Sequence, residues 1–148
     1  MPDRLDLPFG TRIRRDEPVK AQFDGRDLPA FAGDTVASAL IASGQWVISR
    51  SFKYHRPRGP LSMAGHDANT LIQTTRAPNR LAEELAITDF AHTTVQKVTG
   101  SLMADRSAVL DWLGRFLPVG FYYRAFYRPF GIWQWWERVI RWAAGLGV

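Results

Sequence analysis

The sequence contains no cysteine among its 148 residues. Without a thiol the chain can form no disulfide bond and no thiolate nucleophile, and it cannot hold zinc or an iron–sulfur cluster through cysteine. Proteins without disulfides are typical of reducing compartments, so we expect a cytoplasmic location.

Long apolar runs are also missing. No stretch approaches the roughly 18 uncharged apolar residues that read as a transmembrane helix. The first ten residues, MPDRLDLPFG, lack the apolar core of a signal peptide. The sequence therefore predicts neither a membrane-spanning segment nor a leader.

Acidic residues are absent between Thr35 and His66, although the chain contains 14 of them. The same interval contains four basic residues, Arg50, Lys53, Arg56 and Arg58. Aromatic residues are uneven as well, because ten of the nineteen lie between Phe121 and Trp142. These differences predict two parts of unlike character: residues 13–100, preceded by an irregular arm over 1–12, and residues 101–148.

The first part begins with a strand pattern. Apolar and polar residues alternate over 19–23, which is typical of a half-buried strand. The pair Asp24-Gly25 is a hairpin turn signal. A returning strand follows over 28–31, where Pro29 restricts it to the edge of a sheet.

A helix is predicted within FAGDTVASALIASG, residues 31–44, with Asp34 or Thr35 as its N-cap and Gly44 at its end. Further strands are predicted at 45–49 and 70–74, and one or two more over 85–99. This order indicates an α+β fold in which one helix packs across a mixed sheet of four or five strands. That is the β-grasp arrangement of 2Fe–2S ferredoxins.

The second part has a helical pattern. Apolar residues form one face of a predicted helix over 107–117, which Pro118 ends. A second amphipathic helix is predicted over 131–146, after the aromatic stretch FYYRAFYRPFG. We therefore expect a helical, aromatic-rich C-terminal extension.

The loop RPRGPLSMAGHDANTLIQ, residues 56–73, contains Ser62, Asp67 and Thr70. Their spacing is that of the clustered ligands of a plant-type ferredoxin, C-x₄-C-x₂-C. Hydroxyl and carboxylate groups do not replace the soft thiolates that a cluster needs. The three histidines match no metal-ligand spacing, so the sequence predicts no metal site and no catalytic residue.

Four stretches resemble the N-terminal region of the alpha subunit of heterotetrameric sarcosine oxidase and of related amino-acid and opine oxidoreductases. They are FAGDTVASALIASG, SRSFKYHRPRG, LPVGFYYRAFYRPF and RWAAGLG. The resemblance implies a ferredoxin-like domain whose cluster ligands have been lost, at positions Ser62, Asp67 and Thr70.

The resemblance also implies a cofactor-free, non-catalytic subunit of a flavoprotein complex. No G-x-G-x-x-G follows a strand in this chain, so FAD, FMN and NAD would bind to partner subunits of a hetero-oligomeric oxidoreductase. The expected role is structural: a separately encoded piece, or a part, of the large subunit that completes and braces it.

Two regions are predicted to contact a partner. The first is the basic run with Arg50, Lys53, His55, Arg56 and Arg58, which could instead form an internal carboxylate network, bind nucleic acid or face solvent. The second is aromatic and comprises Phe121, Tyr122, Tyr123, Trp133, Trp135 and Trp136. The helix predicted over 131–146, which contains the three tryptophans, could also pack on its own chain or lie at a membrane surface. The alternative function is a stand-alone basic module for nucleic acid or an anionic surface.

Overall fold

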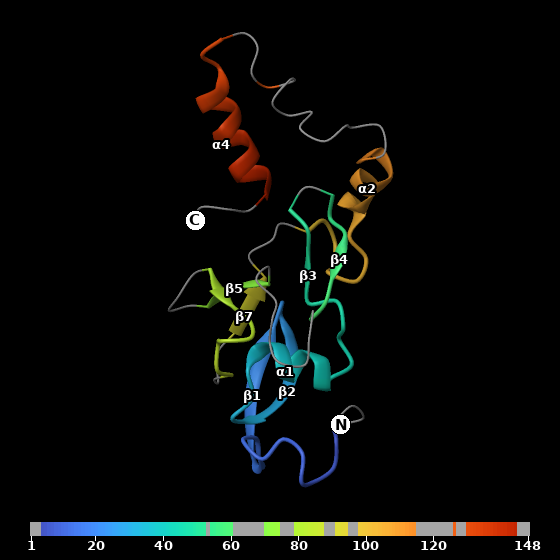
Figure 1. The fold of residues 1–148 in the computed structure, drawn as a ribbon, viewed down its shortest axis with the longest axis vertical. Coiled ribbons are helices and arrows are strands. Elements are labelled where there is room, and N and C mark those ends of the chain that lie inside the picture. Colours follow the sequence, from blue (N-terminus) through green and yellow to red (C-terminus); the bar gives the residue numbers. More distant parts are fainter. Residues whose placement is uncertain are drawn as a thin grey trace.

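The computed structural model describes residues 4–52, 54–60, 70–74, 79–87, 91–94, 98–114, 126 and 130–144. Its main element is a five-stranded sheet with strand order β2-β1-β7-β5-β6 (Figure 1). These strands are β1 (Arg14–Phe23), β2 (Arg26–Ala32), β5 (Leu71–Thr74), β6 (Arg80–Leu81) and β7 (Ala91–Thr94).

The sheet is mixed. β1 pairs antiparallel with β2 and parallel with β7, and β5 pairs antiparallel with both β7 and β6. A parallel pair cannot be joined by a tight turn, so the chain between β1 and β7 must cross over. That crossover contains the helix α1 (Val36–Ala42) and the loop region after it.

The predicted hairpin at Asp24-Gly25 is confirmed. Both residues have positive φ, 47° and 75°, as a two-residue turn between twisted strands requires. β1 starts earlier than predicted, at Arg14, with a register irregularity between Arg14 and Pro18. β2 is an edge strand, where the proline at position 29 costs no ladder hydrogen bond within the sheet.

Helix α1 forms where the sequence predicts it. Thr35 is the N-cap, and its hydroxyl accepts from the Ser38 N–H while the Ser38 hydroxyl accepts from the Thr35 N–H. This reciprocal pair satisfies two first-turn donors. The helix ends before Gly44, which adopts φ 85°.

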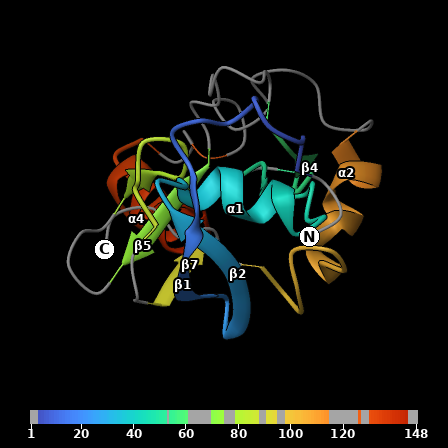
Figure 2. The ribbon, with the colours of Figure 1, turned by 90° about the horizontal axis from the view of Figure 1, so that it is seen from below.

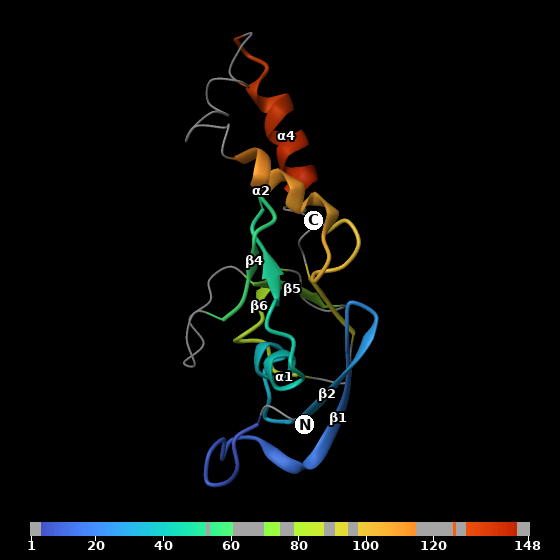
Figure 3. The ribbon, with the colours of Figure 1, turned by 90° about the vertical axis from the view of Figure 1, so that its right-hand side faces the viewer.

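The core lies between α1 and the sheet. Val36, Ala39 and Leu40 are almost fully buried against residues of β1, β2 and β5. The N–H groups of Val36 and Ala37 donate to the carbonyls of Leu85 and Ala82, which joins the helix start to the segment after β6. Figures 2 and 3 show α1 on one side of β1 and β2.

The prediction of a strand over 45–49 is wrong in extent, and the strand that forms lies outside the five-stranded sheet. Only Ser49–Arg50 is extended, as β3, and it pairs with β4 (Pro57–Arg58) in a separate two-stranded sheet. The chain turns back within six residues, so this pairing is local. The strand predicted over 70–74 is confirmed as β5, one of those over 85–99 is β7, and β6 was not predicted.

Helical structure follows over η1 (Arg106–Ala108) and α2 (Val109–Gly114), and again at α4 (Trp133–Ala144). Residues 115–117 of the first predicted helix and 145–146 of the second lie outside the described residues. α2 and α4 both lie at the end of the molecule away from the N-terminus (Figures 1 and 3). None of the described helices has both the length and the apolar character to cross a bilayer.

Candidate functional site

The first residue of the basic run, Arg50, is buried inside the chain. This side chain is 6% exposed, and its Nε and Nη2 donate to the carbonyls of Leu102 and Met103 at 2.7 and 3.2 Å. Its Nη1 donates to the carbonyl of His55 at 2.7 Å. A planar guanidinium suits this use because its donors diverge in a fixed fork. Arg50 therefore ties β3 to the segment that leads into α2.

His55 and Asp105 form the centre of the same network. The Nδ1 of His55 lies 2.6 Å from Oδ2 of Asp105, and the Nε of Arg50 lies 4.0 Å from that oxygen. The other oxygen, Oδ1, accepts from the N–H groups of Thr99 and Ser107 at 2.9 and 3.0 Å. Asp105 thus caps η1 through Oδ1 and binds the basic run through Oδ2.

These contacts set the ionisation of Asp105. Burial raises the pKa of this carboxyl, but the hydrogen bonds from Thr99, His55 and Ser107, together with the charge of His55, outweigh burial. The net effect is a pKa below the ordinary value. Asp105 is therefore held as a carboxylate, the form that can accept from all its partners.

Two more residues of the run contact α2. The Nε of Arg56 donates to Oδ1 of Asp111 at 2.6 Å, and both side chains are about half exposed. The ring of Tyr54 packs so closely on Gly114 that a Cβ there would lie 2.9 Å from the tyrosine Cε1. We call Arg50, Tyr54, His55 and Arg56 the bracket, because together they hold residues 102–114.

The predicted cluster positions are described only at Thr70. This residue is fully buried, and its hydroxyl donates to the hydroxyl of Ser49 at 3.2 Å. Its carbonyl accepts from the Ala82 N–H, next to β6. Ser62 and Asp67 lie outside the described residues. Among the described residues, no group of three or more histidine or acidic side chains could hold a metal ion.

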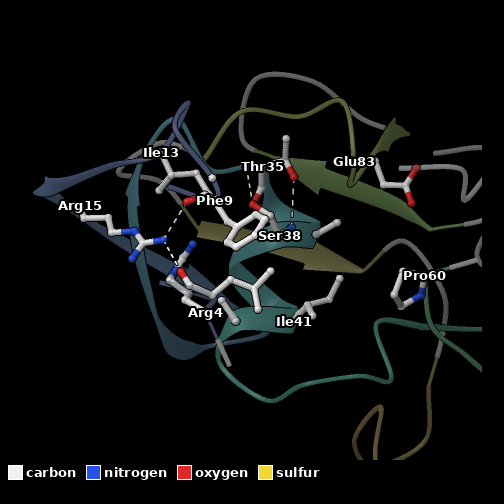
Figure 4. A pocket seen from close by; sticks show the side chains of 13 residues that line it. Arg4, Phe9, Ile13, Arg15, Thr35, Ser38, Ile41, Pro60 and Glu83 are labelled. Carbon is white, nitrogen blue, oxygen red and sulfur yellow. Dashed lines mark hydrogen bonds between the residues drawn. The ribbon is translucent and has the colours of Figure 1, made fainter. Parts of the chain in front are cut away.

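A pocket of about 580 Å³ lies between the N-terminal segment and α1 (Figure 4). Arg15 closes one end of it, donating through Nη2 to the carbonyls of Leu5 and Phe9. Its lining is mixed: apolar side chains such as Ile13 and Ile41 lie beside Arg4 and Glu83. The sequence predicts no site here, because residues 1–12 have the pattern of an irregular arm.

Asp34 binds the N-terminal segment through Arg4. It is buried, and its carboxylate accepts from both terminal nitrogens of Arg4, from the Phe31 N–H and from the Ser38 hydroxyl. A carboxylate buried in this way needs a cation or several hydrogen-bond donors, and Arg4, thirty residues earlier, supplies the cation. From the sequence, Asp34 is predicted only as a possible N-cap of the helix.

The residues predicted to bind a partner have different surroundings. Arg50 is internal and His55 is nearly so, whereas Arg56 and Arg58 are exposed. Trp135 is 53% exposed, while Trp133 and Trp136 are partly covered, and Trp136 packs on Phe126 at 4.5 Å between ring centroids. Lys53, Phe121, Tyr122 and Tyr123 lie outside the described residues.

Comparison with known proteins gives the family. The sequence model of the 2Fe-2S iron-sulfur cluster binding domain matches residues 16–96, which include β1 to β7 and α1 apart from the first residues of β1. The chain belongs to this family. The match also includes Thr70 and the other two predicted cluster positions.

Three relatives of the chain are sarcosine oxidase alpha subunits. The subunit of Rhizobium meliloti is 40% identical in an alignment 146 residues long that covers 95% of this chain and 15% of the relative. Subunits of two Corynebacterium strains, U-96 and P-1, are 46% and 41% identical over 48% and 63% of this chain, and over 8% and 9% of their own lengths. The chain thus spans a small fraction of the relatives it matches.

The family name raises the question of a 2Fe–2S cluster, and the residues present do not fit one held by thiolates. No cysteine exists to supply a soft ligand. At the described ligand position, the Thr70 hydroxyl is already hydrogen-bonded to Ser49 inside the core. The residues of this chain therefore do not fit a role in cluster chemistry.

Proposed function

We propose that this chain is a non-catalytic, structural part of a sarcosine oxidase-like oxidoreductase. It would correspond to the N-terminal part of the large subunit of a flavin-dependent complex that oxidises amines or amino acids. The observation that carries this proposal is the 40% identity to a sarcosine oxidase alpha subunit over 95% of the chain, in a 2Fe–2S family member without cysteine.

The fold assignment within this proposal is a β-grasp domain over residues 13–100. Three features support it: the mixed sheet, the parallel pairing of β1 with β7, and the single helix α1 packed on the sheet. Residues 101–148 would form the helical, aromatic-rich extension. The network around Asp105 lies at the proposed boundary and links the two parts.

Loss of the cluster is the second element of the proposal. Removal of a cluster from a ferredoxin loop leaves buried backbone and polar groups that need other partners. The hydrogen bond between Thr70 and Ser49, and that from Ala82 to the Thr70 carbonyl, serve this purpose at the end of the loop. The loop would then be kept for its shape rather than for electron transfer.

Flavin and nicotinamide chemistry would belong to partner polypeptides of this cytoplasmic complex. The chain lacks the glycine-rich phosphate loop of dinucleotide-binding domains. Its own contribution would be surface for assembly. The exposed members of the predicted contact set that the structure describes are Arg56, Arg58 and Trp135.

The test is co-expression with the cognate polypeptides that match the remainder of the sarcosine oxidase subunits. We expect co-purification as a stoichiometric, yellow complex at high salt, without iron or acid-labile sulfide on this chain. A cysteine-ligated ferredoxin, purified anaerobically in parallel, is the control for recovery of a labile cluster. Stoichiometric iron and sulfide on the 148-residue chain would contradict the structural role.

A basic nucleic-acid module, the alternative from the sequence, has less support from the described residues. Arg50 is inside the network, and Arg56 is paired with Asp111. Both cations are therefore committed to contacts within the chain. Salt-sensitive binding to unrelated DNA by the isolated chain would favour the alternative.

A further inference from the structure

Helix α2 is attached to the rest of the chain by its small and polar side. Asp111 accepts from Arg56, and Gly114 lies against the ring of Tyr54. These two positions are three residues apart, so they share one face of the helix. The preceding cap, Asp105, is held by His55 and Arg50. The side of α2 that faces the bracket is thus its polar side.

The apolar side of α2 faces outward. Val109, Trp112 and Leu113 follow the i, i+3, i+4 spacing of a single stripe, opposite Asp111 and Gly114 at 3.6 residues per turn. They are 58%, 56% and 40% exposed, and the adjoining Leu110 is 38% exposed. A surface helix of a folded domain normally does the reverse and turns its apolar stripe to the core. The orientation of α2 is therefore inverted.

The bracket makes this orientation specific. A helix of six residues is not stable on its own in water, because nucleation costs more than so few hydrogen bonds return. The buried contacts of Arg50, His55 and Asp105 fix the residues that lead into α2, and the fit of Tyr54 on Gly114 fixes its rotation. The chain thus holds a short helix in place while Val109 and Leu113 remain 58% and 40% exposed.

We propose that the stripe Val109–Trp112–Leu113 is a docking surface for the remainder of an alpha-type polypeptide. This inference rests on the proposed function and adds the surface by which the chain would dock. The occupant follows from length: in the Rhizobium meliloti relative, the matched region is 15% of one polypeptide, so a much larger body of chain is available to cover the stripe. The surface it meets would be apolar, because α2 offers no charge on this side.

The experiment measures affinity between the wild-type chain and the cognate polypeptide that matches the remainder of the alpha subunit. The variant V109S/L113S removes two apolar side chains of the stripe. We expect its affinity to fall at least tenfold, in a manner insensitive to salt, since partly exposed anchors become fully buried on docking. The melting temperature of the isolated variant should stay within a few degrees of the wild-type value, because both side chains are partly exposed in the free chain.

A matched control removes apolar groups of similar exposure at the other end of the molecule. Leu5 and Leu7 in the N-terminal segment are 62% and 73% exposed, so L5S/L7S tests for a general effect of lost surface hydrophobicity. We expect this control to bind like the wild type. An equal loss of affinity in both variants would overturn the inference.

Other outcomes separate the inference from the function on which it rests. Wild-type affinity in V109S/L113S would overturn the docking surface and leave the proposed function intact. Failure of the wild-type chain to bind would overturn the proposed function, and the inference with it. If the wild-type chain forms concentration-dependent dimers that V109S/L113S does not form, the inference is overturned, because the surface then binds a second copy of the chain. Sedimentation with phosphatidylcholine and phosphatidylglycerol vesicles, lost in the same variant, would replace the partner by a lipid surface.

Discussion

Helices α1 and α2 contain similar apolar side chains but place them in opposite environments. In α1, Val36 and Leu40 are at most 1% exposed, whereas Val109 and Leu113 of α2 are 58% and 40% exposed. α1 is stabilised by the core that it covers. α2 is stabilised by contacts at its cap and on its polar side.

The comparison shows that hydrophobic periodicity states which residues share a face but not what the face contacts. For α1 the covering surface is supplied by β1 and β2, which lie next to it in sequence. For α2 the bracket, some fifty residues earlier, contacts the polar side through Asp105, Asp111 and Gly114. The exposure of Val109 and Leu113 is the feature that the proposed docking surface accounts for.

The largest effect is expected from truncation in α1. Leu40→Ala removes a fully buried side chain and should lower the free energy of unfolding by about 3 kcal/mol, from lost burial and the cavity left behind. Leu110→Ala in α2 is the matched change and should cost less than about 0.5 kcal/mol. Urea unfolding of the two isolated variants measures both values. A similar cost at both positions would mean that α2 has a core of its own.

A smaller effect is expected from Asp105→Asn, which keeps the shape of the cap and removes its charge. The loss should be about 2 kcal/mol near neutral pH, since charge-assisted hydrogen bonds from His55 and the backbone are weakened. Ser107→Ala is the control, because it keeps the backbone N–H that donates to Asp105 and removes only the exposed hydrogen bond between the Ser107 and Thr99 hydroxyls.

The pH dependence of this effect has a definite sign. The pKa of Asp105 is lower in the folded chain than its ordinary value of 3.8, so its contribution is present above pH 3.8 and is lost as pH falls through the folded value. Below that range, wild type and Asp105→Asn should converge in stability. Urea unfolding from pH 5 to pH 2.5 measures this, and a constant difference between them would contradict the assignment.

The smallest effect is expected at the exposed ion pair of the bracket. Arg56→Gln should change the free energy of unfolding by less than about 0.5 kcal/mol, because solvent screens a pair in which both side chains are about half exposed. Urea unfolding at low and high salt measures the difference. A cost as large as that of Asp105→Asn would show that the exposed contact, and not the buried network, holds α2.

Local signals predicted the parts of the fold that depend on neighbouring residues. The Asp24-Gly25 turn and the capped start of α1 are each encoded within a few positions, and both are confirmed. The strand predicted over 45–49 is limited to Ser49–Arg50, because its pairing depends on where the chain returns, at Pro57–Arg58. Sequence periodicity does not contain that information.

The contacts of the candidate site were predicted less well, because their partners are far apart in sequence. His55 and Asp105 are separated by fifty residues, and no spacing rule links them. Asp105 could have been found as a cap, since it precedes the predicted helix at 107 and caps commonly include aspartate. The internal use of Arg50 was among the alternatives for the basic run, but the choice needed the carbonyls of Leu102 and Met103.

The edges of the five-stranded sheet have a consequence for aggregation. An exposed strand edge can recruit another chain through its unpaired N–H and C=O groups. β2, at one edge, carries a proline with no N–H at position 29 and exposed charges at Arg26 and Asp27. β6, at the other, is two residues long. Addition of a strand from another molecule is therefore disfavoured at both edges of the sheet. The exposed apolar residues of α2 can then contact a partner without the sheets of neighbouring molecules joining into a continuous sheet.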